Sequence, residues 1–379
     1  MSSPAAGCVT ISDIKSARDY IRASGLVRRT PLLRGFEFPI VDRNGADGTA
    51  TPEVYLKMES LQRTGSFKIR GMTNCFRVHE ESIRARGAVT LSAGNAGRSF
   101  AFLCGRLGVT ATVCMPNTVP RDRVRTIEGL GSTVELVPGV ALMDAVRRYV
   151  DGEGRTLIHP FDDADLIAGH GSVGLEILED IPDLGAEDVV AVCCGGGGLV
   201  AGVAAALKLS GCEARVVAVE PEGSPCMTAS MRLGRPAVEP EDFITDTIAH
   251  GLAPPFAGTI TFAHVKKFVD DVVTVTDLEL VAATRKMYGH GFVVETSGCA
   301  GLAAAMAGKL GLRNTGRIVC VVSGSNISTR DMDEEAGNEE GAETIVNSTT
   351  FFSATHGWVA AAAILVGVGI GWGLHSRTS

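Results

Sequence analysis

Residues 189–199 read VVAVCCGGGGL, a run of β-branched and small apolar residues that leads into four consecutive glycines. An apolar run without polar alternation is typical of a strand buried on both faces of a parallel sheet. The glycines allow a tight turn before the helical pattern of residues 199–209. We interpret this segment as a strand, a glycine loop and a helix of an α/β fold.

The same pattern recurs along the chain, with helical segments such as 97–107 and 300–310 following short apolar runs. These further runs are VYLKM (54–58), AVTL (88–91), ATVCM (111–115), TVELV (133–137), VVAV (216–219) and IVCVV (318–322). They are too short and too rich in β-branched residues for buried helices. Their alternation with helices predicts a doubly wound α/β architecture.

Composition excludes several functional classes. The chain has 379 residues, 45% of them hydrophobic and 21% charged, which is typical of a large globular protein. Its formal net charge of −8 argues against nucleic-acid binding, which needs a basic face. Ten cysteines without a CxxC pair, and an N-terminus without an apolar signal core, predict reduced thiols in the cytoplasm.

Two further segments follow the last predicted strand. Residues 331–350 are acidic and lack apolar periodicity, which predicts a solvated linker. Residues 354–374 include an uncharged stretch between Trp358 and Trp372 that is near the lower length limit for a membrane-spanning helix. We expect a C-terminal hydrophobic helix that anchors the protein to an intracellular membrane; a helix docked on the protein or a partner is the alternative.

The first candidate site segment, ESLQRTGSFKIRG (59–71), follows a predicted strand. Turn and N-cap residues at 64–66 place Lys68 in the first turn of the next helix, near the positive end of its dipole. A lysine is electrostatically disfavoured there, and an amine of lowered pKa is what Schiff-base chemistry requires. An exposed lysine at a helix start explains this segment alone equally well.

Three more loops carry candidate binding groups. In SAGNAG (92–97), backbone N–H groups and the side chains of Ser92 and Asn95 can hold a carboxylate. The tetraglycine loop suits a single terminal phosphate, because no Walker Lys-Ser/Thr follows it and the dinucleotide pattern lacks its acid. SGSN (323–326) follows the last strand. Loops at the carboxyl ends of parallel strands converge on one crevice, so we expect a single site.

In this order, SFKIRG, SAGNAG, CGGGGL and SGSN resemble the motifs of the fold type II pyridoxal-phosphate enzymes, in particular the serine/threonine dehydratase and serine racemase branch. The resemblance implies a tryptophan synthase β-like fold of two open, twisted, mostly parallel sheets flanked by helices. It places a large cofactor-binding domain at 1–77 and 167–330 and a small domain at 78–166. It also implies pyridoxal 5′-phosphate as the cofactor and a homodimer.

Individual roles follow from the same resemblance. Lys68 matches the lysine that forms a Schiff base with the cofactor, and Phe67 the residue that packs on its ring. Asn95 matches the partner of the ring hydroxyl, and Ser323 the partner of the ring nitrogen. The phosphate would be bound by Gly195, Gly196, Gly197 and Gly198. The substrate would be bound by Ser66, Ser92, Ala93, Asn95 and Ala96.

The implied reaction is the β-elimination of L-serine or L-threonine to a 2-oxo acid and ammonia, with Lys68 as covalent anchor and then general base. Serine racemases carry a serine where this chain has Ala93, so we expect racemisation to be minor. A racemase or another β-hydroxy amino acid lyase of this fold is one alternative. A membrane-tethered, non-catalytic binding protein on the same scaffold is the alternative of another class.

Three departures from the family pattern bear on ions and protons. Glu220 matches a metal-binding glutamate of the racemases, but Cys226 replaces their aspartate, so we expect a monovalent cation at Glu220 and Ser224 instead of magnesium or calcium. His170 and His250 replace a common glutamine and a usual aspartate. We expect both histidines to have hydrogen-bonded structural roles.

Overall fold

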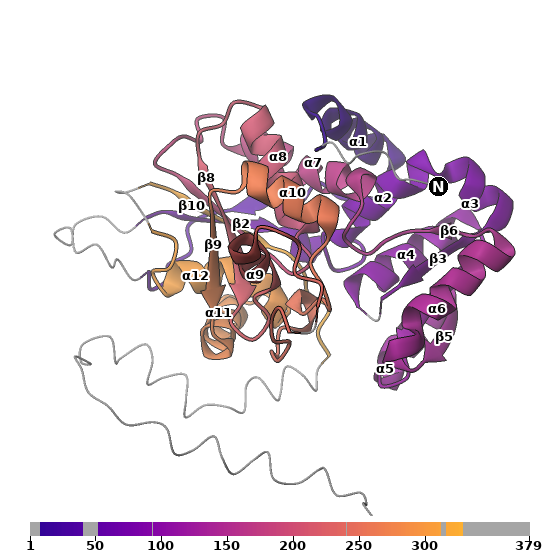
Figure 1. Cartoon of the computed structure of the whole chain (residues 1–379). Helices are drawn as coiled ribbons and strands as arrows, with labels where there is room; N and C mark the ends of the chain where they lie inside the picture. Colours follow the sequence, from indigo (N-terminus) through magenta and orange to yellow (C-terminus); the bar gives the residue numbers. More distant parts are fainter. Residues whose placement is uncertain (1–7, 41–51, 93, 240, 312–315, 329–379) are drawn as a thin grey trace, which may run out of the picture. The chain divides into compact units, whose positions relative to one another are not determined.

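The computed structural model describes residues 8–40, 52–92, 94–239, 241–311 and 316–328 (Figure 1). Ala93, the acidic segment 331–350 and the expected C-terminal hydrophobic helix at 354–374 lie outside the described residues. Within the described ranges, each helix is too short or too polar to cross a membrane.

The larger sheet has six strands and brings three of the motif loops to neighbouring strand ends. In spatial order its strands are β1 (Leu32–Leu33), β2 (Val54–Met58), β10 (Ile318–Val322), β7 (Val189–Cys193), β8 (Arg215–Pro221) and β9 (Asp271–Val275). β1 pairs with β2 in antiparallel fashion, and every other neighbouring pair is parallel. The loops after β2, β10 and β7 therefore leave the same edge of the sheet side by side.

The smaller sheet is wholly parallel and carries the fourth motif. In spatial order its strands are β5 (Thr133–Val137), β4 (Ala111–Pro116), β3 (Ala88–Leu91) and β6 (Thr156–Leu157). Ala88 and Val89 are successive residues of β3 and pack into separate apolar cores. This alternation is what a strand buried on both faces requires.

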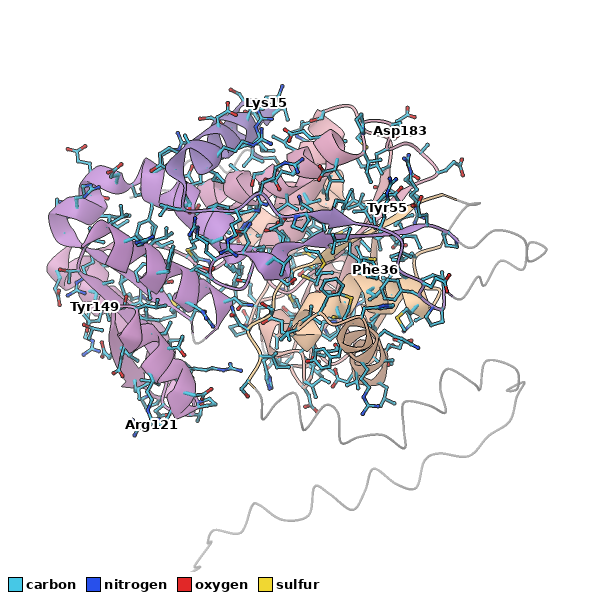
Figure 2. The ribbon with its side chains drawn as sticks, turned by 180° about the vertical axis from the view of Figure 1, so that it is seen from behind. Lys15, Phe36, Tyr55, Arg121, Tyr149 and Asp183 are labelled. Atoms are coloured by element: carbon cyan, nitrogen blue, oxygen red, sulfur yellow. The ribbon has the colours of Figure 1, made fainter. Side chains whose placement is uncertain are left out.

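Twelve α-helices flank the sheets in the described ranges. They are α1 (Ile11–Ser24), α2 (Lys68–Val78), α3 (Glu80–Arg86), α4 (Asn95–Leu107), α5 (Arg121–Gly129), α6 (Leu142–Arg147), α7 (Ala164–Asp180), α8 (Gly198–Leu209), α9 (Cys226–Leu233), α10 (Thr259–Phe268), α11 (Asp277–Gly289) and α12 (Ala300–Met306). Figure 2 shows the same structure from behind. Its labels mark Arg121 and Tyr149 in the part of the chain that forms the smaller sheet and its helices, and Tyr55 and Asp183 in the part that forms the larger sheet and its helices.

Helix α2 joins the two halves of the fold. Its residues Ile69, Met72 and Phe76 belong to the apolar core of the smaller sheet. The same helix packs against α7, which in turn packs against α8 of the larger sheet's core. The helix that begins at Lys68 is therefore held from both sides.

The predicted runs become strands, with three differences from the sequence analysis. The helix expected over 300–310 ends at Met306, because Gly308 has a positive φ of 66° that stops it. Helix α2 begins at Lys68 as expected, but its N-cap is Phe67 and no side chain caps it. The strands β1 and β6, with two residues each, are too short to be read from a pattern, and the edge strand β9 was missed although three of its five residues are valines.

Candidate active site

Lys68 points from the first turn of α2 into the site. Its Nζ atom donates a 2.5 Å hydrogen bond to the Pro160 carbonyl and lies 5.1 Å from the centre of the Phe67 ring. Burial lowers the pKa of the Lys68 amine to about 8. Desolvation penalises the charged form of an amine, so Lys68 has an accessible neutral form near physiological pH.

The turn before Lys68 is fixed by the loop after β10. The Phe67 N–H donates to the Ser323 carbonyl at 3.0 Å, and the Ser325 N–H donates to the Gly65 carbonyl at 2.8 Å. Gly65 has a φ of 73°, and a Cβ there would lie 2.3 Å from Oδ1 of Asn326. Both the backbone conformation and the close approach therefore require glycine at this position.

The tetraglycine loop forms an open cradle at the N-terminus of α8. Gly197 has a φ of 86°, and a Cβ on Gly196 would lie 2.4 Å from the Phe161 ring. Within the described residues, the backbone N–H groups of Gly195, Gly196 and Gly197 donate to no protein group. Unpaired amides at a helix N-terminus fit an anionic phosphate.

One short segment connects this cradle to the lysine. Pro160 accepts the hydrogen bond from Lys68, and the next residue, Phe161, packs on Gly196. His159 holds the segment in place, since its Nδ1 atom accepts from the N–H groups of Phe161 and Asp162. The Lys68 amine and the glycine loop thus contact two neighbouring residues of the same segment, Pro160 and Phe161.

Asn95 begins α4 and takes part in a chain of side-chain hydrogen bonds. Its Nδ2 donates to Oε1 of Glu295 at 2.6 Å, and its Oδ1 accepts from Nδ2 of Asn326 at 2.5 Å. Asn326 also donates to the Thr64 carbonyl at 2.8 Å. Glu295 was not among the predicted site residues; its contact with Asn95 joins positions 200 residues apart.

The remaining predicted residues have more local surroundings. Ser92 follows β3, and its hydroxyl accepts from the Gly94 N–H at 3.2 Å. Ala96 is buried in the first turn of α4. The Ser66 hydroxyl is buried without a hydrogen-bond partner in the structure. Ser323 is buried, and its hydroxyl hydrogen-bonds to the Cys193 thiol.

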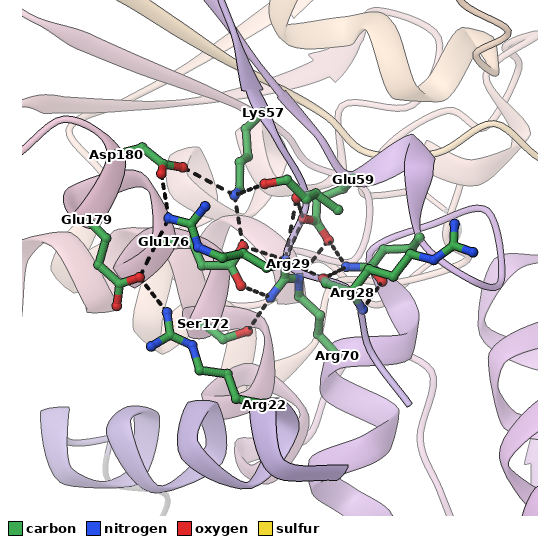
Figure 3. Close-up of polar contacts among 12 residues, drawn as sticks. Arg22, Arg28, Arg29, Lys57, Glu59, Arg70, Ser172, Glu176, Glu179 and Asp180 are labelled. Carbon is green, nitrogen blue, oxygen red and sulfur yellow. Dashed lines mark hydrogen bonds and ion pairs between the residues drawn. The ribbon is translucent and has the colours of Figure 1, made fainter. Parts of the chain in front are cut away.

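A buried ion-pair network surrounds Arg70, two residues after Lys68 in α2 (Figure 3). Arg70 is fully buried, with Nε 2.7 Å from Oε2 of Glu59 and Nη2 2.8 Å from Oε2 of Glu176. Lys57 donates to the same Glu176 oxygen at 2.8 Å. These two glutamates raise the pKa of Arg70 despite its burial. The network binds α2 to α7 and to the end of β2.

Glu220 and Ser224, where a monovalent cation is expected, lie close to the start of α9. The two carboxylate oxygens of Glu220 accept from the N–H groups of Met227 and Thr228 at 2.6 and 2.8 Å, and from the Thr228 hydroxyl at 2.8 Å. Glu220 therefore caps α9. The Ser224 hydroxyl is buried without a partner among the described residues, and the described part of the chain holds no cluster of three His, Cys, Asp or Glu side chains. The cation at Glu220 and Ser224 stays a prediction.

The two unexplained histidines differ in their surroundings. His250 is exposed at the start of a short 3-10 helix, His250–Leu252. His170 is fully buried in α7, and its ring packs edge-on against Phe67 with 4.8 Å between the ring centres. Neither ring nitrogen of His170 has a hydrogen-bond partner in the structure. The hydrogen-bonded role expected for His170 is therefore wrong.

Comparison with known proteins assigns this fold and site to a family. Residues 23–324 match the family model described as pyridoxal-phosphate dependent enzyme. The chain is 37% identical over 329 residues to an L-threonine ammonia-lyase of Thermotoga maritima, covering 86% of this chain and 77% of the relative. It is 34% identical to a catabolic L-threonine dehydratase of Escherichia coli over 335 residues, covering 87% and 96%.

Solved structures of related enzymes align with this fold over most of its length. Maize serine racemase aligns with a TM-score of 0.76 at 30% identity, covering 87% of this chain and 98% of the racemase. A threonine deaminase of Solanum lycopersicum aligns with a TM-score of 0.75 at 27% identity, covering 89% and 98%. The matched segment takes in the first three motif loops and the first two residues of the fourth, and this chain belongs to the family of pyridoxal-phosphate dependent enzymes.

Proposed function

We propose that this protein is an L-serine/L-threonine ammonia-lyase, which eliminates the β-hydroxyl group and the amine to give a 2-oxo acid and ammonia. The observation that carries the proposal is the Lys68 amine of lowered pKa close to the unpaired amides of the glycine loop. Lys68 contacts Pro160, and the glycine loop contacts the next residue, Phe161. Relatives that carry the names threonine ammonia-lyase and threonine dehydratase support it over most of the chain.

Pyridoxal phosphate, when bound, supplies an electron sink that acidifies the Cα–H bond of an amino acid. Lys68 would anchor it covalently, and the amides of Gly195–Gly197 would hold its phosphate. Asn95 and Ser323 would be the partners of its ring hydroxyl and ring nitrogen. Ser323 is a neutral hydroxyl, so it would leave the ring a weaker acceptor of electrons than a carboxylic acid would, which favours elimination.

Proton transfer falls to Lys68. The Lys68 amine, in its neutral form, would remove the proton from Cα of the bound substrate as a general base. Its pKa of about 8 lies close to physiological pH, where a general base works best. The substrate carboxylate is bound at the N-terminus of α4, where the helix dipole and the Ser92–Ala96 segment favour an anion.

Serine racemase is the second candidate, and the alignment with maize serine racemase favours keeping it. Ala93 lacks the hydroxyl that would return a proton to the opposite face of Cα, so the elimination is the main reaction. Serine and threonine differ by one methyl group, which a pocket distinguishes by only about 1–3 kcal/mol.

The remaining assignments are proposals that rest on the sequence. They are a homodimer, a cytoplasmic catalytic region, a membrane anchor at 354–374, and a division into domains at 1–77 with 167–330 and at 78–166. The placement of the smaller sheet between residues 88 and 157 supports that division.

A substrate panel on the full chain tests the function. L-serine and L-threonine are supplied to the cofactor-loaded protein, and 2-oxo acid, ammonia and the enantiomers of the remaining amino acid are measured together. We expect equal amounts of 2-oxo acid and ammonia with little D-amino acid. D-serine as the main product would favour the racemase, and no product from either substrate would contradict both.

A further inference from the structure

Glu295 places a carboxylate in the site that the proposed reaction does not use. It directly precedes the 3-10 helix Thr296–Cys299 and lies next to the loop after β10. Its backbone N–H donates to the Gly324 carbonyl at 3.0 Å. A Cβ on Gly324 would lie 2.2 Å from Oε1 of Glu295, so only glycine there permits this approach.

The contacts of Glu295 fix the orientation of the Asn95 amide. Nδ2 of Asn326 donates to both the Thr64 carbonyl and Oδ1 of Asn95, so Asn95 must present its oxygen to Asn326. Its NH₂ group then faces Glu295 and gives one hydrogen to Oε1 at 2.6 Å. An amide NH₂ has two hydrogens, so one remains for another acceptor.

This part of the site is reachable, although its surroundings are buried. Lys68, Asn95, Glu295 and Asn326 each keep part of their surface exposed, whereas Ser66, Phe67 and Ser323 beside them are buried. The exposed part of Asn95 lets a ligand approach this residue.

The electrostatic surroundings make Glu295 responsive to protons. Burial raises its pKa to about 7, while the hydrogen bonds from Asn95 and from the Asn326 N–H, and the more distant Arg123 and Arg98, lower it. Cys193 of β7 faces both Glu295 and Lys68. The described residues form no ion pair with Glu295, so its charge is held by hydrogen bonds alone.

We infer that Glu295 is a positioning residue of the active site: its carboxylate holds the Asn95 amide so that the second amide hydrogen is directed to the ring oxygen of the cofactor. The inference rests on the proposed function. It assigns Glu295 two measurable effects, one on cofactor affinity through Asn95 and one on the protonation of the cofactor-bound site through its negative charge.

The test compares Glu295→Gln and Glu295→Ala with Glu279→Gln. Glu279 caps α11 and pairs with Lys309, so its variant also perturbs a helix cap but does not touch Asn95. Two quantities are measured on each protein: the dissociation constant for pyridoxal phosphate, and the pH midpoint of the visible absorption band of the loaded protein. Neither needs turnover.

We expect Glu295→Gln to lower the pH midpoint by about one unit, because a negative charge that favours the protonated form is removed. Its affinity for the cofactor stays within a few-fold of wild type, because the Gln carbonyl can still accept from Asn95. Glu295→Ala lowers the midpoint similarly and weakens binding about tenfold, which is the cost of one lost hydrogen bond. Glu279→Gln changes neither quantity.

Wild-type midpoints and affinities in both Glu295 variants would overturn the inference. So would an equal midpoint shift in Glu279→Gln, because the effect would then be a general consequence of a weakened fold. If the wild-type protein shows no visible band with the cofactor, the proposed function itself has failed. A wild-type band that is lost in Lys68→Ala but unchanged in the Glu295 variants leaves the function standing and rejects only the role of Glu295.

Discussion

Lys68 occupies the first turn of α2, where its amine donates to the Pro160 carbonyl and burial lowers its pKa to about 8. The sequence indicated a lowered pKa from the helix dipole, but the structure identifies burial as the main cause. A lysine reacts with an aldehyde as the neutral amine. At pH 7.5 roughly a quarter of the Lys68 amines are neutral, against roughly one in a thousand for a lysine of ordinary pKa.

The rate of cofactor attachment should therefore rise with pH and level off above about 8. It is measured as the initial growth of the visible band after pyridoxal phosphate is added to the cofactor-free protein between pH 6 and 10. A free lysine derivative under the same conditions corrects for titration of the cofactor. A midpoint near 10 in the protein would show that Lys68 is not desolvated.

Arg70 is a residue whose removal should affect stability strongly. It is fully buried and hydrogen-bonded to Glu59, Glu176 and Ser172. Arg70→Met leaves two buried carboxylates short of positive charge, which costs about 3–5 kcal/mol of unfolding free energy. Denaturant unfolding of the cofactor-free protein measures the loss.

Arg84→Met is the matched control for Arg70→Met, because Arg84 pairs with Glu80 at the surface of α3. Exposed pairs at this spacing contribute about 0.3–0.5 kcal/mol. We expect the Arg70 variant to lose several times more free energy than the Arg84 variant. Equal losses would mean that the network does not hold α2 in place.

At the scale of elements, the tetraglycine loop makes the clearest prediction. Gly197→Ala combines a strained φ of 86° with a Cβ that would lie 2.8 Å from Cε of Met227. Gly211 has a similar φ of 81° but no atom within 4 Å of its Cβ position. We expect both Ala variants to lose about 1–2 kcal/mol of stability, the cost of a left-handed conformation.

Cofactor binding should separate the two glycine variants. Gly197→Ala shifts the amide cradle and weakens binding of pyridoxal phosphate at least tenfold, while Gly211→Ala leaves the dissociation constant unchanged. Fluorescence titration of both proteins with the cofactor measures this. A wild-type affinity in Gly197→Ala would argue against the loop as the phosphate site.

The elements that the sequence predicts well are those with a strong local pattern. The runs at 54–58, 88–91, 133–137 and 318–322 coincide with strands in the structure. β9 (Asp271–Val275) was missed; it is an edge strand in which Val272 and Val273 are half-buried and only Val275 is buried. Such a strand is stabilised by its neighbour β8 more than by its own sequence.

The residues of the site also divide into those that a local sequence pattern predicts and those that it does not. Lys68 and the glycine loop have motifs that follow from local backbone needs, so they can be found in the sequence. The partnership of Glu295 with Asn95 joins positions 200 residues apart, and no local pattern encodes it. Glu220 caps α9 across only seven to eight residues, but no cap motif in the sequence announces it, and its contacts alone show that the carboxylate accepts hydrogen bonds from this helix.

The whole molecule makes a prediction about its thiols. All ten cysteines are free, and eight of them are buried, whereas Cys8 and Cys212 are half-buried. Burial raises the pKa of Cys104, Cys226 and Cys320, which slows their reaction further. We expect an aromatic disulfide reagent at pH 8 to label about two thiols quickly in the native protein and all ten after unfolding.

Fewer than ten thiols in the unfolded, unreduced protein would reveal a disulfide and contradict the expected reducing compartment. Fast labelling of most thiols in the native protein would contradict the buried core of the larger sheet. Residue-by-residue mass spectrometry of the labelled protein identifies which cysteines react, so that Cys8 and Cys212 can be separated from the rest.

Lys68 should bind pyridoxal phosphate covalently. Mass spectrometry of the cofactor-loaded full chain, reduced with borohydride and then digested, measures this attachment. We predict one phosphopyridoxyl group per chain, located on Lys68 and absent from Lys68→Ala. An adduct on another lysine, or no adduct in a protein that binds the cofactor, would contradict it.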